Sequence, residues 1–274
     1  MKKRVFCVVM TIAMSLGISF ALAGCGETPV EMFNKANENM SAAKDVSIES
    51  TFNADVESSG VTFTVSGKLN AQYIKNSEKP LESQVAMFGN IEMMDQKSKV
   101  KMYMTDEKMY MNAGGSKTYT DISKSMSDEY MQSLLDLGTS EKIDDYVTDS
   151  SSDGDNITLT IDGSKYLESL IKKAEKNADD SVSDKDMKSV KSLLKDSGFS
   201  KMKIEATIKD DNFTSLKYSC DFTLDLGTLM GTTTSEKTPV KFEFDCKKIK
   251  INDGIKIDFP DFKDYEKATE DSIV

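Results

Sequence analysis

Methionine is the residue type that stands out among the side chains able to do chemistry. The chain contains 17 methionines, and seven of them lie within residues 87–111. Met102 and Met104 alternate along one predicted strand, and Met109 and Met111 alternate along the next. Each pair therefore points to one face of its strand. Thioethers in this arrangement form a soft, shape-tolerant apolar surface, and Met-x-Met pairs also suit Cu(I).

Three interpretations of this methionine cluster are open. Tyr103 and Tyr110 take the opposite face of the same hairpin, whose turn is residues 105–108, so strand alternation alone explains the spacing. The plainest interpretation is core filling beneath helices, and the second is a lining for a lipid-like ligand. The third is copper, but we expect no metal site because the chain has no His. The candidate ligand-binding residues are apolar strand positions: Phe52, Phe63, Val65, Met87, Met102, Met104, Met109 and Met111.

The first 25 residues have the pattern of an export signal that ends at a cysteine. A basic start, Lys2-Lys3-Arg4, precedes an apolar run over residues 5–23 that stops at small residues before Cys25. The segment Leu22-Ala23-Gly24-Cys25 resembles the lipobox of bacterial lipoproteins, in which the cysteine is diacylated and becomes the first mature residue. The resemblance predicts a signal peptide over residues 1–24 and a lipid anchor on Cys25. It also predicts a place on the extracytoplasmic face of the bacterial cell membrane.

An uncleaved transmembrane helix is the alternative to that signal peptide. Residues 5–24 are just long enough, since about 20 apolar residues span a bilayer. However, no Lys or Arg cluster follows to stop transfer, and Glu27 and Glu31 come next. The sequence therefore favours cleavage and an anchor of two acyl chains, in which each buried methylene contributes about 0.8 kcal/mol.

Charge and composition narrow the function classes. The leader takes three of the 35 basic residues and none of the 46 acidic ones, leaving 32 basic residues and a net charge of −14. We expect no nucleic-acid partner for a chain this acidic, and attachment to an anionic membrane depends on the lipid anchor. The mature chain has no His, and its only Arg, Arg4, leaves with the leader. Catalysis by imidazole and recognition of anions by guanidinium are therefore not available, and we expect no enzyme and no cofactor. We also expect a monomer.

Two cysteines remain once the leader and the lipidation site are set aside, namely Cys220 and Cys246. They lie in two alternating segments, residues 213–226 and 240–251. If these segments form a hairpin centred near residue 233, Cys220 lies opposite Cys246, within reach of a disulfide. An exported chain favours the disulfide, and two free buried thiols are the alternative.

A helix is predicted directly after the lipidation site. Thr28 can cap it, Pro29 suits its first position, and Glu31 lies in its first turn. The remaining Asn, Lys and Glu positions form a polar face. The pattern predicts an amphipathic helix that ends near Lys44, with these residues on its apolar face: Val30, Phe33, Ala36, Met40 and Ala43.

The rest of the chain is dominated by alternation with period two. Two such runs, residues 46–56 and 61–71, flank Ser58-Ser59-Gly60 and predict a long hairpin. Further strands are predicted at residues 81–93, 99–105, 108–112, 117–121, 156–161, 201–210, 213–226 and 240–251. Helices are predicted at residues 127–137, 164–174 and 185–195, whereas the tail over residues 259–268 has no firm pattern. This order predicts one α+β domain over residues 25–274, with a short tether, an antiparallel sheet and helices on one face.

An acidic stretch in the middle of the chain partly fits a calcium-binding loop. Asp149, Asp153, Gly154 and Asp155 match the pattern, but Thr160 stands where a bidentate Glu belongs. A solvated turn is the plainer interpretation.

Several short motifs of the chain match a known family. They are Asn34-Lys35-Ala36 through Ala42-Lys44, residues 47–52, the Lys101-Met-Tyr-Met and Lys108-Met-Tyr-Met pair, and Lys117-Thr-Tyr. With these pieces the chain resembles the LolA/LppX-like lipoproteins, and most closely uncharacterised lipoproteins of low-GC Gram-positive bacteria. The resemblance covers most of residues 28–260 and rests on pattern more than identity. It implies a curved antiparallel half-barrel whose helices cover a concave apolar face, where relatives carry acyl chains or glycolipids, and it brings no catalytic motif.

Two functions fit these observations. The first is a membrane-anchored, non-catalytic lipoprotein that binds a lipid-like or apolar ligand in the cell envelope. The alternative is a surface interaction or structural lipoprotein. It would contact a protein or wall polymer through its acidic outer face and would have no ligand cavity.

Overall fold

The computed structural model describes residues 27–58, 61–93, 96–122, 143–166, 168–169, 198–199, 201–225 and 237–268. The predicted signal peptide over residues 1–24, the predicted lipidation site Cys25 and the helices predicted at 127–137 and 185–195 lie outside these ranges. Of the helix predicted at 164–174, residues 164–166 and 168–169 are described, and they are helical.

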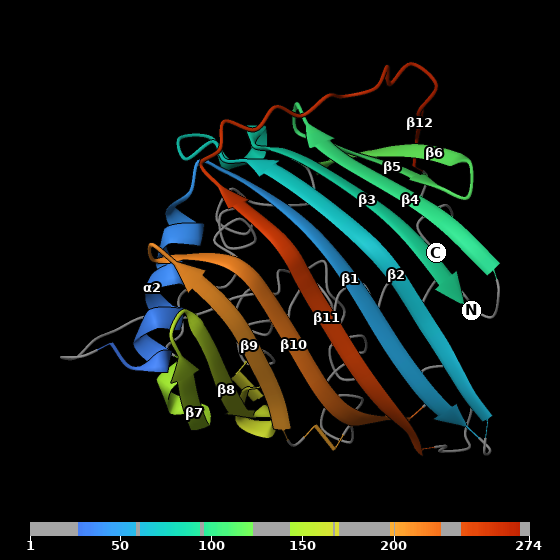
Figure 1. Ribbon diagram of the computed structural model, residues 1–274. Helices are drawn as coiled ribbons and strands as arrows, with labels where there is room; N and C mark the ends of the chain where they lie inside the picture. The colour runs from blue at the N-terminus through green and yellow to red at the C-terminus, as the bar shows by residue number, and fades with distance from the viewer. Residues whose placement is uncertain are drawn as a thin grey trace.

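One curved sheet of twelve strands forms the body of the molecule (Figure 1). The strand order is β12-β6-β5-β4-β3-β2-β1-β11-β10-β9-β8-β7. Every neighbouring pair is antiparallel except β12 and β6, so the predicted curved antiparallel sheet of an α+β fold is confirmed. The strands are β1 (Asp45–Ser58), β2 (Val61–Ile74), β3 (Gln84–Met93), β4 (Gln96–Thr105), β5 (Lys108–Ala113), β6 (Ser116–Asp121), β7 (Val147–Asp153), β8 (Asn156–Asp162), β9 (Lys201–Lys209), β10 (Asn212–Asp225), β11 (Lys237–Ile251) and β12 (Glu266–Lys267).

Two meanders of consecutive strands build this sheet. The first runs from β1 to β6 and the second from β7 to β11, and they join where β1 pairs with β11 from Val46↔Ile251 to Val56↔Val240. The long hairpin predicted around Ser58-Ser59-Gly60 is confirmed, since β1 and β2 pair over their full lengths. The central strands are therefore β1, β2 and β11, which are among the longest in the sheet.

The predicted amphipathic helix is confirmed as α2 (Pro29–Ala42). A reciprocal cap fixes its start, because the Thr28 N–H donates to the Glu31 carboxylate and the Glu31 N–H donates to the Thr28 hydroxyl. The helix packs over β7 to β10, where Phe33 meets Phe213 edge to face at a centroid distance of 5.0 Å. We call the face of the sheet that α2 covers the inner face, and the opposite face the outer face.

Two boundaries differ from the sequence prediction. Strand β3 begins at Gln84 rather than near residue 81, because Pro80–Glu82 forms the short 3-10 helix η1. The acidic stretch is not a loop throughout, since Val147–Asp153 is the edge strand β7. It turns into β8 at Gly154, whose φ of +59° favours glycine, and the exposed side chains agree with a solvated turn there.

The C-terminal tail is ordered, although the sequence showed no firm pattern there. Residues 255–268, which we call the C-terminal strap, cross the outer face of β3 to β6 and end as β12 beside β6 (Figure 1). Lys117 and Asp264 form an ion pair at 3.3 Å, and Lys267 pairs with Asp121. The strap therefore occupies the edge of β6, which would otherwise present unpaired backbone groups.

The structure corrects the predicted disulfide between Cys220 and Cys246. The register of β10 and β11 places Cys220 opposite Phe242 and Cys246 opposite Leu216, four residues along the strand from Cys220. At about 3.3 Å per residue the two cysteines are about 13 Å apart along the strands. A disulfide needs Cα atoms within about 7 Å. Both thiols are accordingly free and buried.

Candidate functional site: the inner face of the sheet

Rows of paired apolar residues cross the inner face from one meander to the other. Residues paired across neighbouring strands point to the same face, so the register can be followed as a continuous row. One row crosses the centre of the sheet and belongs to the main core cluster that includes Phe33 and Phe213. It consists of Leu159, Ile204, Tyr218, Phe244, Phe52, Gly67 and Ile91.

The methionines form two shorter rows beside the central row. Met87 lies opposite Met102, and Met102 lies opposite Met111, so one row of three thioethers runs across β3, β4 and β5. Met104 lies opposite Met109 in the next row, and this pair packs with Ile122 in a separate small cluster. Tyr103 and Tyr110 pair with each other on the outer face, as the alternation predicts.

All eight candidate ligand-binding residues lie on the inner face. Phe52, Met87 and Met104 are buried, whereas Met102 and Met109 are half-buried. Phe63 and Val65 lie on β2 nearer the β1–β2 turn and are half-buried as well, so they are set apart from the methionine rows. Met111 is 37% exposed, although the other two methionines of its row are buried or half-buried.

The Phe52 ring packs on this face against a position that has no side chain, Gly67. It pairs with Gly67, and a Cβ built on Gly67 would lie 2.6 Å from the Phe52 ring and 2.5 Å from the Asn90 carbonyl oxygen. Only glycine therefore allows the ring to lie flat over β2. A strand glycine whose same-face neighbours, here Val65 and Leu69, are apolar is the sequence signal for such close approach.

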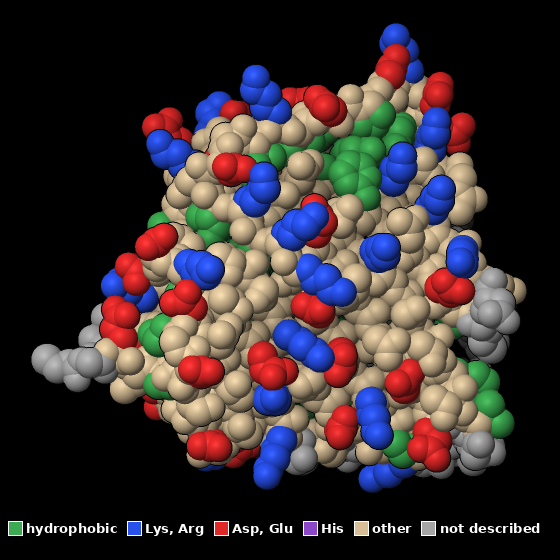
Figure 2. Space-filling model, in the orientation of Figure 1, with side chains coloured by type: hydrophobic (Ala, Val, Ile, Leu, Met, Phe, Trp, Pro, Cys, Tyr) green, Lys and Arg blue, Asp and Glu red, His purple; other side chains and the backbone are tan. Residues whose placement is uncertain are grey.

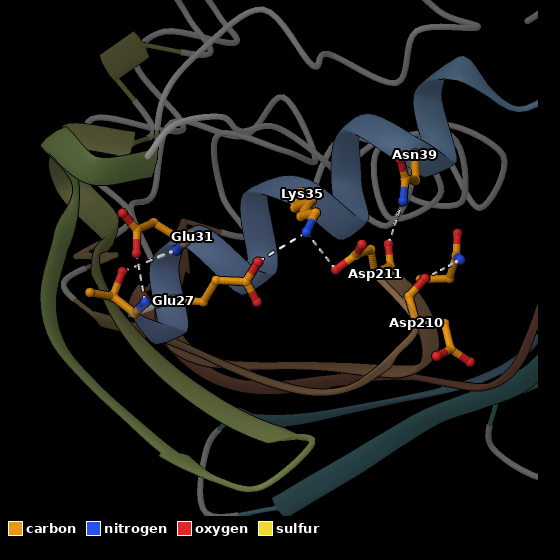
Figure 3. A network of polar contacts seen from close by, with 8 residues as sticks. Glu27, Glu31, Lys35, Asn39, Asp210 and Asp211 are labelled. Carbon is orange, nitrogen blue, oxygen red and sulfur yellow. Dashed lines mark hydrogen bonds and ion pairs between the residues drawn. The ribbon is translucent and has the colours of Figure 1, made fainter. Parts of the chain in front are cut away.

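A polar clamp holds α2 at the edge of the inner face (Figure 3). Lys35 bridges Glu27 at 2.9 Å and Asp211 at 3.0 Å, and the Asn39 side-chain amide donates to the Asp211 carbonyl oxygen at 2.8 Å. Asp210 and Asp211 form the turn between β9 and β10, both with positive φ. The two carboxylates beside Lys35 raise its pKa, with the hydrogen bond to Glu27 as the larger cause. The far end of the helix is tied to β2, because the Tyr73 hydroxyl donates to the Met40 carbonyl oxygen.

Two asparagines of α2 were assigned to its polar face from the sequence, and the structure corrects this. Asn34 and Asn37 are 1% and 0% exposed, and within the described part of the chain none of their side-chain amide atoms has a hydrogen-bond partner. Most buried polar groups in proteins have a partner, so two orphaned amides on one helix are exceptional. Asn34 and Asn37 are three residues apart, and each directly follows an apolar-face residue, Phe33 or Ala36. This spacing was the signal in the sequence that the two amides share one side of the helix.

The outer face offers charge but no comparable site. Lysine and acidic side chains are interspersed over it (Figure 2). A shallow groove of about 350 Å³ is lined by residues that include Glu49, Lys248, Lys250 and Asp253. Lys248 pairs with Glu49 at 2.8 Å and Lys250 pairs with Asp253 at 2.9 Å, so these charges already neutralise one another.

Among the described residues, no group of three His, Cys, Asp or Glu side chains is placed to hold a metal ion. Within the same residues, no helix is long and apolar enough to cross a membrane.

Comparison with solved structures finds proteins with low sequence identity. LprF from Mycobacterium bovis is 12% identical, with 86% of this chain and 99% of that chain covered and a TM-score of 0.42. A LolA superfamily protein, NE2245 from Nitrosomonas europaea, is 9% identical, with 86% and 96% covered and a TM-score of 0.23. The ywiB protein from Bacillus subtilis is 7% identical, with 74% and 93% covered and a TM-score of 0.20.

No curated protein matches the chain. A family model matches residues 28–262, which include α2, strands β1 to β11 and most of the C-terminal strap. This chain therefore belongs to the family of unknown function DUF6612.

Proposed function

We propose that this protein is a membrane-anchored, non-catalytic lipoprotein of the cell envelope that binds a lipid-like or apolar ligand on the inner face of its sheet. The observation that carries the proposal is the row Met87–Met102–Met111, which continues the apolar inner face across strands that lie beyond the helix α2. Unbranched thioethers adapt to ligands of variable shape better than branched aliphatic side chains do. The partial exposure of Met111 makes it the open end of that row.

The position of the lipid anchor supports this proposal. α2 begins at Pro29, four residues after the proposed lipidation site Cys25. A tether this short would hold the inner face near the membrane surface, where a lipid-like ligand is supplied. Attachment is tested by metabolic labelling with radioactive palmitate, and we expect the Cys25→Ala variant to lose the label.

The ligand is tested by native mass spectrometry of the full chain extracted from its own membrane. We expect bound molecules with the masses of lipids, and we expect Met111→Gln to lower their occupancy roughly tenfold through lost apolar contact. Val61→Gln is the matched control, because Val61 is also a large exposed apolar residue but lies at the far end of β2. Equal loss in both variants would argue against the methionine row as the binding surface.

The alternative function makes a different prediction for the same preparation. A surface interaction or structural lipoprotein would carry no lipid-like molecule on its inner face. It would instead be recovered by crosslinking to a protein or wall polymer through its charged outer face, and this capture would weaken as salt is added.

A further inference from the structure

The orphaned amides of Asn34 and Asn37 are the strongest unexplained feature of the described residues. Each amide offers two N–H donors and one acceptor oxygen, and all four nitrogen and oxygen atoms are buried without a partner. The third asparagine of the same helix has a partner, since the Asn39 side-chain amide donates a hydrogen bond to the Asp211 carbonyl oxygen at 2.8 Å. Burying a polar group without a hydrogen bond costs free energy, so such a pair points to a site where a bound molecule supplies the missing hydrogen bonds.

The helix geometry shows where the two amides point. At 100° per residue, Asn37 projects between Val30 and Phe33, which both pack against the main core cluster. Asn34 lies beside it, one turn along the same side of the helix. The amide pair is therefore a polar spot on the buried side of α2.

The polar spot lies close to the apolar rows. Asn37 precedes Met40 by one turn, and the Met40 carbonyl accepts a hydrogen bond from Tyr73 of β2 at 3.3 Å. Tyr73 packs in turn against the small cluster of Met104 and Ile122, which Met109 also contacts. A chain-like molecule that meets the amides with one end can therefore continue along the inner face toward the methionines.

We propose that Asn34 and Asn37 bind the polar end of an amphiphile whose apolar chain lies on the inner face. The polar end must carry both a donor and an acceptor and no charge, as a hydroxyl, ester or amide group does, because no charged side chain is paired with the two amides. This inference rests on the proposed function and adds to it the chemistry of the ligand's head group. A pure hydrocarbon would leave the amides orphaned.

Two probes with matched chains test the head-group preference. The full chain, released from detergent micelles, is analysed by native mass spectrometry with 1-monooleoylglycerol, which carries hydroxyl and ester groups, or with 1-octadecene, which carries no polar group. We expect Asn34→Leu with Asn37→Leu to lower the occupancy of 1-monooleoylglycerol at least tenfold and to leave that of 1-octadecene unchanged or higher. Glu38→Leu is the matched control, because Glu38 is an exposed residue of the same helix, and it should change neither occupancy.

A second measurement uses the unaltered protein. In spectra of nitrogen-15-labelled protein, the side-chain NH₂ signals of Asn34 and Asn37 should shift downfield with 1-monooleoylglycerol and stay in place with 1-octadecene. If both probes bind but neither the double variant nor the NH₂ signals distinguish them, the head-group site is wrong, whereas the proposed binding of an apolar ligand is supported. If neither probe binds, both the proposed function and the head-group site are wrong. The head-group site is also wrong if the NH₂ chemical shifts show hydrogen bonding to water in the free protein and do not change with either probe.

Discussion

Tyr110 of β5 and Phe262 of the C-terminal strap stack face to face, with ring centroids 3.8 Å apart and planes inclined by 12°. Phe262 also meets Tyr103 and Tyr265 edge to face, at 5.6 Å and 5.3 Å. These contacts place one aromatic ring of the strap at the centre of a cluster on the outer face. The strap is therefore held by ring packing, and its short pairing with β6 adds only two strand residues, Glu266 and Lys267.

Replacing Phe262 should release the strap. Phe262→Ala removes a half-buried ring with four aromatic neighbours, and we expect it to lower the free energy of unfolding by about 2 kcal/mol. Urea denaturation measures this change, and limited proteolysis should cut the strap first. Lys263→Ala is the control, because Lys263 is exposed and pairs with the nearby exposed Asp261. If both variants unfold and cut alike, the ring cluster does not hold the strap.

Local patterns made the first meander predictable from the sequence. The Met102–Met111 hairpin has strict alternation and a tight turn at Asp106 and Glu107, which both take positive φ, so its register follows from the turn. The register of β10 and β11 could not be obtained this way. Asp225 pairs with Lys237, which places the midpoint of the two strands at residue 231. Gly231 stands there, but Gly227 and the run of Thr and Ser after it are also compatible with a turn, so the sequence does not single out one position. An error of two residues in the midpoint moved Cys220 four residues away from Cys246.

Features that depend on burial by distant parts of the chain were not predictable. The aromatic residues of the strap have no periodicity of their own, because the rings of β4 and β5 position them. Asn34 and Asn37 resemble an ordinary polar face in the sequence, yet the buried side of α2 is wider than its apolar stripe. The methionine rows were predictable as one face of a hairpin. Their continuation to Met87 required the pairing of β3 with β4.

Gly67 should tolerate no side chain. In Gly67→Ala the new Cβ would overlap the Phe52 ring and the Asn90 carbonyl oxygen, and strand backbone cannot give way easily. We expect a loss of about 2 kcal/mol in unfolding free energy, measured by urea denaturation. Gly89→Ala is the matched control, since its nearest contact would be an ordinary 3.5 Å to Leu69. A Gly89→Ala variant that is destabilised as much as Gly67→Ala would show that strand glycines matter here for another reason.

The clamp between α2 and the β9–β10 turn should depend on one hydrogen bond more than on its ion pairs. Asn39→Ala removes a part-buried hydrogen bond to the Asp211 carbonyl, and we expect a loss of about 1 kcal/mol in unfolding free energy. Lys35→Ala removes two ion pairs that are exposed to solvent, so its effect should be smaller and should vanish in high salt. Thermal unfolding at low and high salt measures both. An effect of Asn39→Ala that also vanishes in salt would contradict this assignment.

The two buried thiols should make the protein sensitive to alkali. Burial raises the pKa of Cys220 and Cys246 to about 12, from an ordinary value of 9.0 in the unfolded chain, and the neighbouring Asp221 and Asp245 add to the effect. Their stabilising contribution is therefore complete below about pH 9 and is lost as the pH rises toward 12, because the unfolded chain releases its protons first.

Unfolding in urea with a reductant, at pH 8 and pH 10, measures this loss. We expect each thiol to contribute a decrease of about 1.4 kcal/mol in unfolding free energy between the two pH values. The control is Cys220→Ala with Cys246→Ala, which is less stable at pH 8 because of lost packing but should lack this part of the pH dependence. Tyr103, whose pKa burial also raises, titrates in both proteins and cancels in the difference. A pH dependence that the double variant retains in full would show that the thiols are accessible to solvent in the folded protein.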